Sequence, residues 1–221
     1  MIAKLCRTLL LAGSMLGAPL LAVAAESAAQ NVDWPGYNND YQARRYSSLD
    51  QINVGNVASS KEVCRLKVQQ GGTFQSGPIV VDGTMYLTTA YETIALDPSI
   101  CKEIWRSSYR SQRSDIWPLN RGVTYMNGRL FRGTPDARLL ALDAKTGKLL
   151  WQDVVGDPAI GEAVPGSPVA WNGVVYTGTG LSDLGIRGRV MAFRAEDGRE
   201  LWRFNLIPIR CWDQQHLCGG G

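Results

Sequence analysis

The chain has 221 residues and a formal net charge of +3 at pH 7, with 23 lysines and arginines against 20 aspartates and glutamates. So small an excess of positive charge argues against a protein that binds nucleic acid or an anionic membrane surface electrostatically. The 24 glycines, the 10 prolines and the many β-branched and aromatic residues indicate strands and tight turns. The length is sufficient for one domain with a buried core.

The first 24 residues have the pattern of a secretory signal peptide. Lys4 and Arg7 make the start of the chain positive, and an apolar run over residues 8–23 leads to small residues that end at Ala24. This run is short and contains glycine and proline, so a membrane-spanning helix is the weaker interpretation. We therefore expect export, with cleavage after Ala24 and no membrane span in the mature chain.

The exported chain keeps four of the five cysteines, because Cys6 leaves with the signal peptide. In an oxidising compartment, disulfide pairing is more common than metal binding. Cys64 and Cys101 lie in strand-like surroundings, and we predict that they pair. Since Cys211 and Cys218 also remain, three connectivities are possible, and free thiols at positions 64 and 101 would refute this pairing.

Residues 25–70 form an N-terminal segment, and residues 71–208 are built from a repeat. Each repeat has an Asp-Gly or Asn-Gly pair between two apolar runs, with the glycines at positions 83, 128 and 173, a spacing of 45 residues. Such pairs are typical of two-residue hairpin turns, which need positive φ angles. Each pair therefore predicts a β-hairpin.

A second hairpin follows in each repeat and closes on a tryptophan. The three copies share the pattern Ala-x-Asp-x-x-x-Gly-x-x-x-Trp, which ends at Trp105, Trp151 and Trp202. Cys101 replaces the glycine of the first copy, and Arg194 replaces the aspartate of the third. Two hairpins in each repeat make four strands, and one such sheet cannot bury both faces without neighbours. The sequence therefore predicts an all-β fold, a partial β-propeller of about three four-stranded blades.

This repeat resembles the tryptophan-docking repeat of the quinoprotein alcohol dehydrogenases, which depend on pyrroloquinoline quinone (PQQ) and in which the indole packs between adjacent blades. The runs Trp34–Asp40, Arg44–Leu49 and Gln51–Asn53 are similar to the opening of the mature enzymes, so the likeness extends from Trp34 to about Pro208. It implies a periplasmic enzyme with PQQ and calcium, oxidation of a small alcohol by hydride transfer to the quinone, and a separate cytochrome c as electron acceptor. The docking tryptophans themselves serve packing rather than chemistry.

The resemblance also implies residues that bind the cofactor. Arg121, in the run Asn120-Arg121-Gly122, matches the family's cofactor-binding arginine, and a guanidinium fork suits the carboxylates of PQQ. A solvated arginine at a strand end is the alternative. Gln75 stands where many members have a cofactor-contacting glutamate; its amide could still bond the quinone, or it could be a polar residue beside a turn.

The extra length of the third repeat falls within residues 178–188. This stretch resembles the family loop that approaches PQQ with small residues and then supplies an acidic calcium ligand. By this likeness Gly180 and Ser182 lie at the cofactor, and Asp183 is the metal ligand, because calcium takes hard oxygen donors. The alternative for Asp183 is an ordinary loop aspartate.

Several positions depart from the family. Asp115 and Ile116 stand where many members have a vicinal cysteine pair, so this chain cannot form that disulfide ring, and Pro165 replaces a cofactor-bonding threonine. Family members continue through several more blades, which carry the catalytic aspartate, and no residue here matches it. We therefore expect a fragment that is inactive alone, and we assign no catalytic residue.

The tail over residues 209–221 loses the repeat pattern, as an irregular loop or a frameshifted end would. Its Cys211, Cys218 and the single histidine His216 make a poor metal site, and no Cys-x-x-Cys-His motif for haem attachment is present.

Two other interpretations remain open beside the dehydrogenase. The first is a non-catalytic propeller with the same repeats that binds proteins in the periplasm, although such a scaffold needs neither Arg121 nor the loop over residues 178–188. The second is a nonfunctional gene fragment, whose exposed edge strands and uncovered blade face would make it poorly soluble or dependent on another chain.

Overall fold

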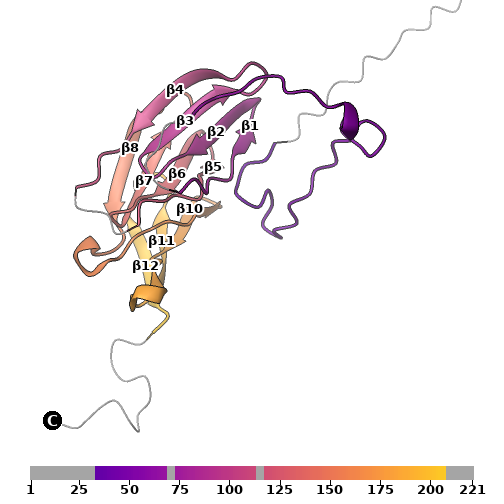
Figure 1. Ribbon diagram of the computed structural model, residues 1–221. Helices are drawn as coiled ribbons and strands as arrows, with labels where there is room; N and C mark the ends of the chain where they lie inside the picture. The colour runs from indigo at the N-terminus through magenta and orange to yellow at the C-terminus, as the bar shows by residue number, and fades with distance from the viewer. Residues whose placement is uncertain (1–32, 69–72, 113–116, 208–221) are drawn as a thin grey trace, which may run out of the picture. The chain divides into compact units, whose positions relative to one another are not determined.

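The computed structural model describes residues 33–68, 73–112 and 117–207, and these residues form three four-stranded antiparallel sheets that stack in chain order (Figure 1). The first sheet contains β1 (Ile79–Val81), β2 (Thr84–Thr88), β3 (Glu92–Asp97) and β4 (Lys102–Ser108). The second contains β5 (Thr124–Met126), β6 (Arg129–Gly133), β7 (Arg138–Asp143) and β8 (Leu149–Val154). The third contains β9 (Val169–Trp171), β10 (Val174–Gly178), β11 (Arg189–Arg194) and β12 (Glu200–Asn205). Three short 3-10 helices lie outside the sheets: η1 (Val57–Ser59), η2 (Pro158–Ile160) and η3 (Ser182–Leu184).

The predicted all-β fold with four strands to each repeat is confirmed, as three unclosed propeller blades. The division of the chain at residues 70 and 208 stays a prediction. The predicted signal peptide, residues 115 and 116, and the tail with its two cysteines and histidine lie outside the described residues. Within the described ranges, no helix has the length and apolar character that crossing a bilayer would need.

The tight turns between the first two strands of each sheet have the conformation that their sequences predict. Both central residues of each turn have φ between +48° and +79°. Positive φ at both positions matches the right-handed twist of the flanking strands, which is why such turns favour Asn or Asp before Gly. The residues concerned are Asp82 and Gly83, Asn127 and Gly128, and Asn172 and Gly173.

Apolar cores fill the spaces between successive sheets. Tyr86 and Ala95 of the first sheet pack with Leu130 and Leu142 of the second. A second cluster, centred on the fully buried Phe131 and Phe193, joins the second sheet to the third. Since each inner face is covered by its neighbour, the stacking of the sheets provides the burial that one sheet alone lacks.

The tryptophans dock as the repeat predicts. The indole Nε1 of Trp105 donates to the carbonyl of Ala144 at 3.1 Å, and that of Trp151 donates to the next sheet in the same way, at 3.0 Å. Gly147 lies beneath the first indole, where a Cβ atom would stand 2.5 Å from the ring. Each docking site therefore combines a glycine with an acceptor carbonyl.

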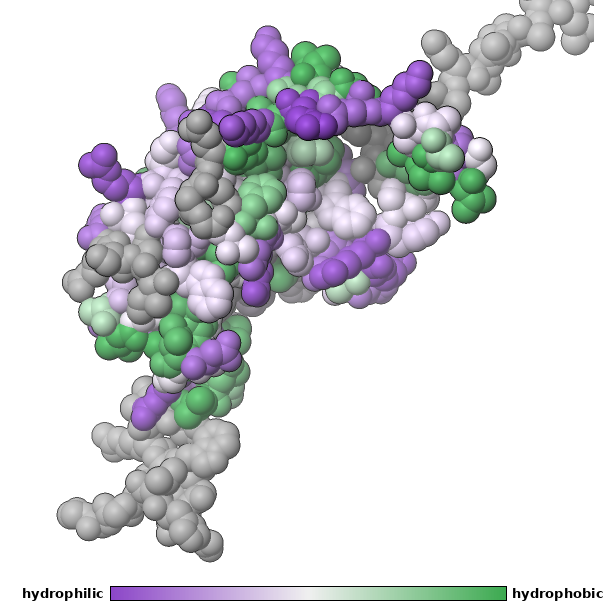
Figure 2. Space-filling model, viewed as in Figure 1, coloured by the Kyte–Doolittle hydropathy of each residue, from purple (hydrophilic) through white to green (hydrophobic). Residues whose placement is uncertain are grey.

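The third docking tryptophan has no sheet over it among the described residues. Trp202 is 46% exposed, and its described ring contact is with Tyr176 of its own sheet, at a ring-centroid distance of 6.2 Å and an interplanar angle of 49°. Trp171 and Phe204 are exposed as well. Figure 2 shows apolar side chains gathered at the lower end of the view, where β12 lies.

The predicted disulfide between Cys64 and Cys101 is confirmed, with a Cα–Cα distance of 5.7 Å. Cys101 has φ of +52° at the repeat position where Gly147 and Gly198 have +70° and +79°. The Sγ atom of Cys64 lies 3.6 Å from the carbonyl oxygen of Pro98, at the repeat position of the carbonyls that accept the indoles. The disulfide thus occupies, in the first sheet, the place that a tryptophan occupies in the other two.

The segment that follows Cys64 covers the free face of the first sheet. Leu66 and Val68 pack against Leu87, Ile94 and Leu96, which point away from the second sheet. This face is therefore closed by chain 64–68 instead of by a preceding blade.

A fully buried arginine joins the first two sheets. Arg132 of β6, 1% exposed, donates to the carbonyl oxygens of Thr89, Ala90 and Glu92 at 2.6–3.1 Å. Burial lowers the pKa of Arg132 to about 10, so the guanidinium remains charged near neutral pH. Carbonyl dipoles balance the charge of Arg132, and its hydrogen bonds connect the two sheets within the interface.

The N-terminal segment over residues 33–43 contacts the first strand of every sheet. We call these strands, β1, β5 and β9, the inner strands. The contacts are hydrogen bonds of 2.6–3.0 Å: between Trp34 and Val80 of β1, between Pro35 and Tyr125 of β5, and between Tyr41 and Ala170 of β9.

Candidate functional site

The candidate site lies where the chain leads into the three inner strands. We call residues 75–78, 119–123 and 164–168 the lead-in segments. Arg121 connects all three through its main chain: its N–H donates to Pro165 O at 2.9 Å, and its carbonyl accepts from Gly77 N–H at 3.0 Å. The main chain at Arg121 therefore has a fixed position relative to three sheets.

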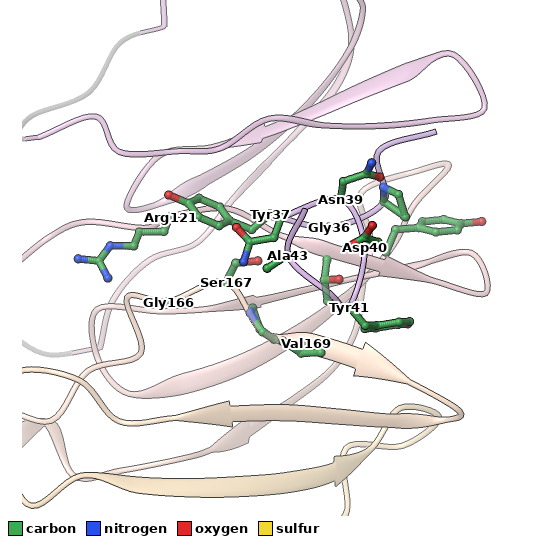
Figure 3. Close-up of a pocket in the computed structure, with 15 residues that line it drawn as sticks. Gly36, Tyr37, Asn39, Asp40, Tyr41, Ala43, Arg121, Gly166, Ser167 and Val169 are labelled. Carbon is green, nitrogen blue, oxygen red and sulfur yellow. The ribbon is translucent and has the colours of Figure 1, made fainter. Parts of the chain in front are cut away.

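Arg121 lies at one end of a cavity of about 380 Å³, and its exposed guanidinium points outward from the other labelled residues (Figure 3). Tyr37 of the N-terminal segment, Thr124 of β5 and Ser167 before β9 also line this cavity. Arg121 Nε donates to Gln75 Oε1 at 3.4 Å, a long hydrogen bond to a neutral amide. In the part of the chain that the structure describes, no carboxylate forms an ion pair with Arg121, so its positive charge is available to an anion.

Two glycines allow the lead-in segments to approach closely beside Arg121. Gly122 has φ of +134°, and a Cβ atom there would stand 2.9 Å from the carbonyl oxygen of Gly77. A Cβ atom on Gly77 would stand 2.7 Å from the ring of Tyr37, which packs against this pair. Residues with side chains would force the segments apart and displace Arg121.

The structure brings Gly180 to the same place. Gly180 N–H donates to Ala163 O at 2.9 Å, and a Cβ atom on Gly180 would stand 2.9 Å from the ring of Pro165. Pro165 in turn accepts the bond from the main chain of Arg121. Gln75, Arg121 and Gly180 are thus close to one another, at the lead-in segments.

Ser182 and Asp183 are not brought to Arg121 in this way. Both lie exposed in η3, and no hydrogen bond or ion pair within the described residues joins either of them to Arg121. Their roles at the cofactor and the metal stay predictions.

No metal centre is assembled by the described residues. They contain no group of three or more His, Cys, Asp or Glu side chains placed to hold an ion. Calcium takes about six to eight oxygen ligands. Asp183 is therefore one candidate carboxylate ligand rather than a site.

Buried polar groups around the site were not recognised from the sequence. Asn120 is 1% exposed, and its side chain bonds both Thr88 and Gly133, although only its neighbour Arg121 stood out in the sequence. The hydroxyls of Ser167 and Thr179 are buried without a hydrogen-bond partner among the described residues. Of these two residues, Ser167 lines the cavity, and an unpartnered buried hydroxyl there fits a polar ligand that would complete its bonding.

Comparisons with known proteins identify the family. The family pattern for the PQQ glucose/ethanol/alcohol dehydrogenase β-propeller domain matches residues 34–217. The dehydrogenase subunit of the quinone alcohol dehydrogenase of Gluconacetobacter polyoxogenes is 38% identical over 188 residues, which are 80% of this chain and 26% of that protein. The quinohemoprotein alcohol dehydrogenase ADH IIB of Pseudomonas putida is 33% identical over 207 residues, 87% of this chain and 30% of that protein.

Solved structures agree with these sequence relatives. The quinohemoprotein alcohol dehydrogenase ADHIIG of Pseudomonas putida HK5 superposes with a TM-score of 0.74 at 36% identity, covering 80% of this chain and 27% of that one. A europium-containing methanol dehydrogenase gives a TM-score of 0.72 at 31% identity, covering 78% and 32%. The chain thus spans between a quarter and a third of the length of these relatives. It belongs to the PQQ-dependent glucose, ethanol and alcohol dehydrogenase family of β-propeller proteins.

Proposed function

We propose that this chain forms part of a periplasmic quinoprotein dehydrogenase that oxidises an alcohol, and that Arg121 binds a carboxylate of PQQ. The observation that supports this most is an exposed guanidinium on a main chain that three sheets hold in place, with only the neutral Gln75 as its side-chain partner among the described residues. PQQ is a planar tricarboxylate, and a guanidinium can bond a carboxylate through two parallel N–H groups. Arg121 and the cofactor are therefore matched in charge and in shape.

When bound, PQQ supplies the acceptor for the hydride of the alcohol, and the protein supplies orientation and electrostatics. We propose that Arg121 anchors one edge of the cofactor and that the amide of Gln75 donates a hydrogen bond to it. Gly180 lacks a Cβ atom and so allows its loop to pack against the ring of Pro165, next to the proposed cofactor. Ser182 is proposed as a hydroxyl donor from the same loop.

We propose Asp183 as a carboxylate ligand of a calcium ion beside the cofactor. The name of one relative, a europium-containing methanol dehydrogenase, shows that a hard trivalent cation is present in that protein. The remaining ligands are proposed to come from outside the described residues. The chemistry attributed to this chain does not depend on the metal.

The proposed location is the periplasm, which the pattern of a signal peptide at residues 1–24 supports. We propose that electrons leave to a separate cytochrome c. One relative is named as a dehydrogenase subunit and another as a quinohemoprotein, and both names agree with a haem acceptor. The substrate is proposed to be a small alcohol.

A titration of the purified chain with PQQ, followed by quenching of tryptophan fluorescence, tests the proposed site. Arg121→Gln is expected to weaken binding about tenfold to hundredfold, because it removes charged hydrogen bonds. Arg199→Gln, at an exposed arginine between β11 and β12, is the matched control and should bind as the wild type does.

Equal affinity of the wild type and Arg121→Gln would refute the assignment of Arg121. An absence of PQQ binding in both calcium-loaded and calcium-free protein would refute the proposal that this chain holds the cofactor. A dye-linked assay of alcohol oxidation with PQQ and calcium then shows whether the chain alone turns over a substrate, and we expect that it does not.

A further inference from the structure

We propose that Asn120 is a positioning residue, which sets the direction of Arg121 through a chain of hydrogen bonds reaching the segment of Gln75. The inference rests on the proposed function, because its purpose is the binding of a carboxylate by Arg121. It assigns the buried residues Asn120 and Thr88 and the half-buried Ser76 to the cofactor site, although none of them lines the cavity.

Asn120 is a hub between the first and second sheets. Its Oδ1 accepts from Thr88 Oγ1 at 2.6 Å and from Gly122 N–H at 2.8 Å, while its Nδ2 donates to Gly133 O at 3.0 Å. The N–H of Gly122 can only donate and the carbonyl of Gly133 can only accept, so the orientation of the amide is fixed.

The direction of the next bonds follows from the same reasoning. Thr88 uses its one hydroxyl proton on Asn120, so the 3.1 Å contact between Ser76 Oγ and Thr88 Oγ1 must use the proton of Ser76. Ser76 Oγ also accepts from the N–H of Thr88 at 3.0 Å. A directed chain therefore runs from Ser76 through Thr88 to Asn120. Its two ends are the sequence neighbours of Gln75 and of Arg121.

The effect of the hub is to remove freedom from the main chain on both sides of Arg121. The bond from Gly122 N–H to Asn120 Oδ1 closes a turn around Arg121 and holds Gly122 at φ of +134°. The main chain of Arg121 itself bonds Gly77 and Pro165. Apart from the long bond to Gln75, no described hydrogen bond holds the side chain of Arg121, so its direction depends on the backbone from which it departs.

This arrangement raises the affinity for a ligand, because an Arg121 that is already fixed loses less conformational entropy on binding. A buried asparagine that serves only stability would not have this effect, since its loss would lower the melting temperature without a specific change in affinity. The two roles can therefore be separated by comparing affinity with stability.

Thr88→Val tests the inference, because valine has nearly the shape of threonine but cannot donate to Asn120. We expect it to weaken PQQ binding about threefold to tenfold, the effect of one lost hydrogen bond. Thr88→Ser keeps the hydroxyl and should restore most of the affinity. Asn120→Ala is expected to weaken binding further, and Thr88→Val carries the test if that variant does not fold.

Tyr86→Phe is the matched control. It removes another buried hydroxyl bond between the same two sheets, that of Tyr86 to Ala144 O at 3.2 Å, away from the lead-in segments. We expect a comparable fall in the melting temperature and an unchanged affinity for PQQ. If Tyr86→Phe weakens binding as much as Thr88→Val does, the positioning role is refuted.

Hydrogen exchange of the ligand-free protein provides a measurement that does not depend on PQQ. In Thr88→Val we expect faster exchange at the amides of Gly122 and Gly77, and unchanged exchange at amides of the third sheet. If wild-type protein does not bind PQQ, the proposed function fails while this measurement still decides the inference. Unchanged exchange at Gly122 and Gly77 in Thr88→Val would overturn it.

Discussion

The double substitution Cys64→Ser/Cys101→Ser is expected to destabilise the first sheet strongly. The disulfide closes a loop with a sequence separation of 37 residues. Loop-closure entropy for this length gives about 4 kcal/mol as the stabilisation lost, an upper estimate because the unfolded chain retains some structure. Loss of the disulfide should also expose Leu66 and Val68, which cover the apolar face of this sheet.

The position of the disulfide allows a sharper test than its removal. Because Cys64 and Cys101 occupy the places of an indole and its glycine, Cys64→Trp/Cys101→Gly should rebuild a docking site like that of Trp105 on Gly147. The new indole could donate to the carbonyl of Pro98. We expect recovery of about 1–2 kcal/mol relative to Cys64→Ala/Cys101→Gly, which has the glycine but no indole.

Urea denaturation followed by far-UV circular dichroism measures these differences, with wild-type protein in a reducing agent as a further control. The reduced wild type should resemble the double serine variant. If the free energy of unfolding of the double serine variant lies within about 0.5 kcal/mol of that of the wild type, the disulfide does not stabilise the sheet as proposed. If the Trp/Gly and Ala/Gly variants are equally stable, the disulfide does not stand in for a docked tryptophan.

Three further predictions concern the scaffold. Gly147→Ala should cost about 2–3 kcal/mol more than Gly128→Ala, since both have positive φ but only the Cβ atom at 147 meets an indole, and denaturant midpoints compare them. Arg132→Met should destabilise by at least about 3 kcal/mol, because it leaves several buried carbonyls without donors, and a melting curve measures this loss. Burial alone raises the pKa of Asp136, but hydrogen bonds to its carboxylate outweigh burial and hold the pKa below its usual value. Its contribution to stability is therefore present above about pH 4 and lost as the pH falls further, and Asp136→Asn should flatten that part of a stability–pH curve.

The parts of the fold that repeat along the chain could be predicted from the sequence. The Asp-Gly and Asn-Gly pairs specify their turns within two residues, and the glycines four positions before Trp151 and Trp202 mark the interface of each sheet with the preceding one. The substitution of Cys101 for that glycine was visible, and so was the pairing with Cys64. What the sequence did not reveal is that this disulfide takes the place of a docked indole, because the alignment of Pro98 with the acceptor carbonyls depends on how the sheets stack.

Residues whose partners lie in another repeat could not be predicted in the same way. Asn120 bonds Thr88 across 32 residues, and Arg132 bonds Thr89 and Ala90 across 43 and 42. Periodicity shows which side chains face a neighbouring sheet. It does not give the offset between two packed sheets, which decides which residues contact one another. Both residues are polar at buried positions, and that is the signal that could have identified them.

The same limit applies to the candidate site. The sequence motif identified Arg121, and the structure places Gln75 and Gly180 beside its lead-in segment. Asp183 was chosen from the same loop as Gly180, but η3 places it exposed and without a described contact to Arg121. Loop residues three positions apart can diverge in space, so nearness in sequence does not make them one site.

The main chain of Arg121 and its side chain have different tasks. The N–H and the carbonyl of Arg121 join the second sheet to the third and the first, and any residue other than proline could make these two bonds. The guanidinium takes no part in that joint, whereas Gly77 and Gly122 beside it do, through a contact that leaves no room for a Cβ atom. The proposed binding group can therefore change without loosening the sheets, while the glycines cannot. A repeat scaffold can in this way keep its joints and still vary its ligand, because the chemistry is attached to the lead-in segments and the stability to the strands that follow.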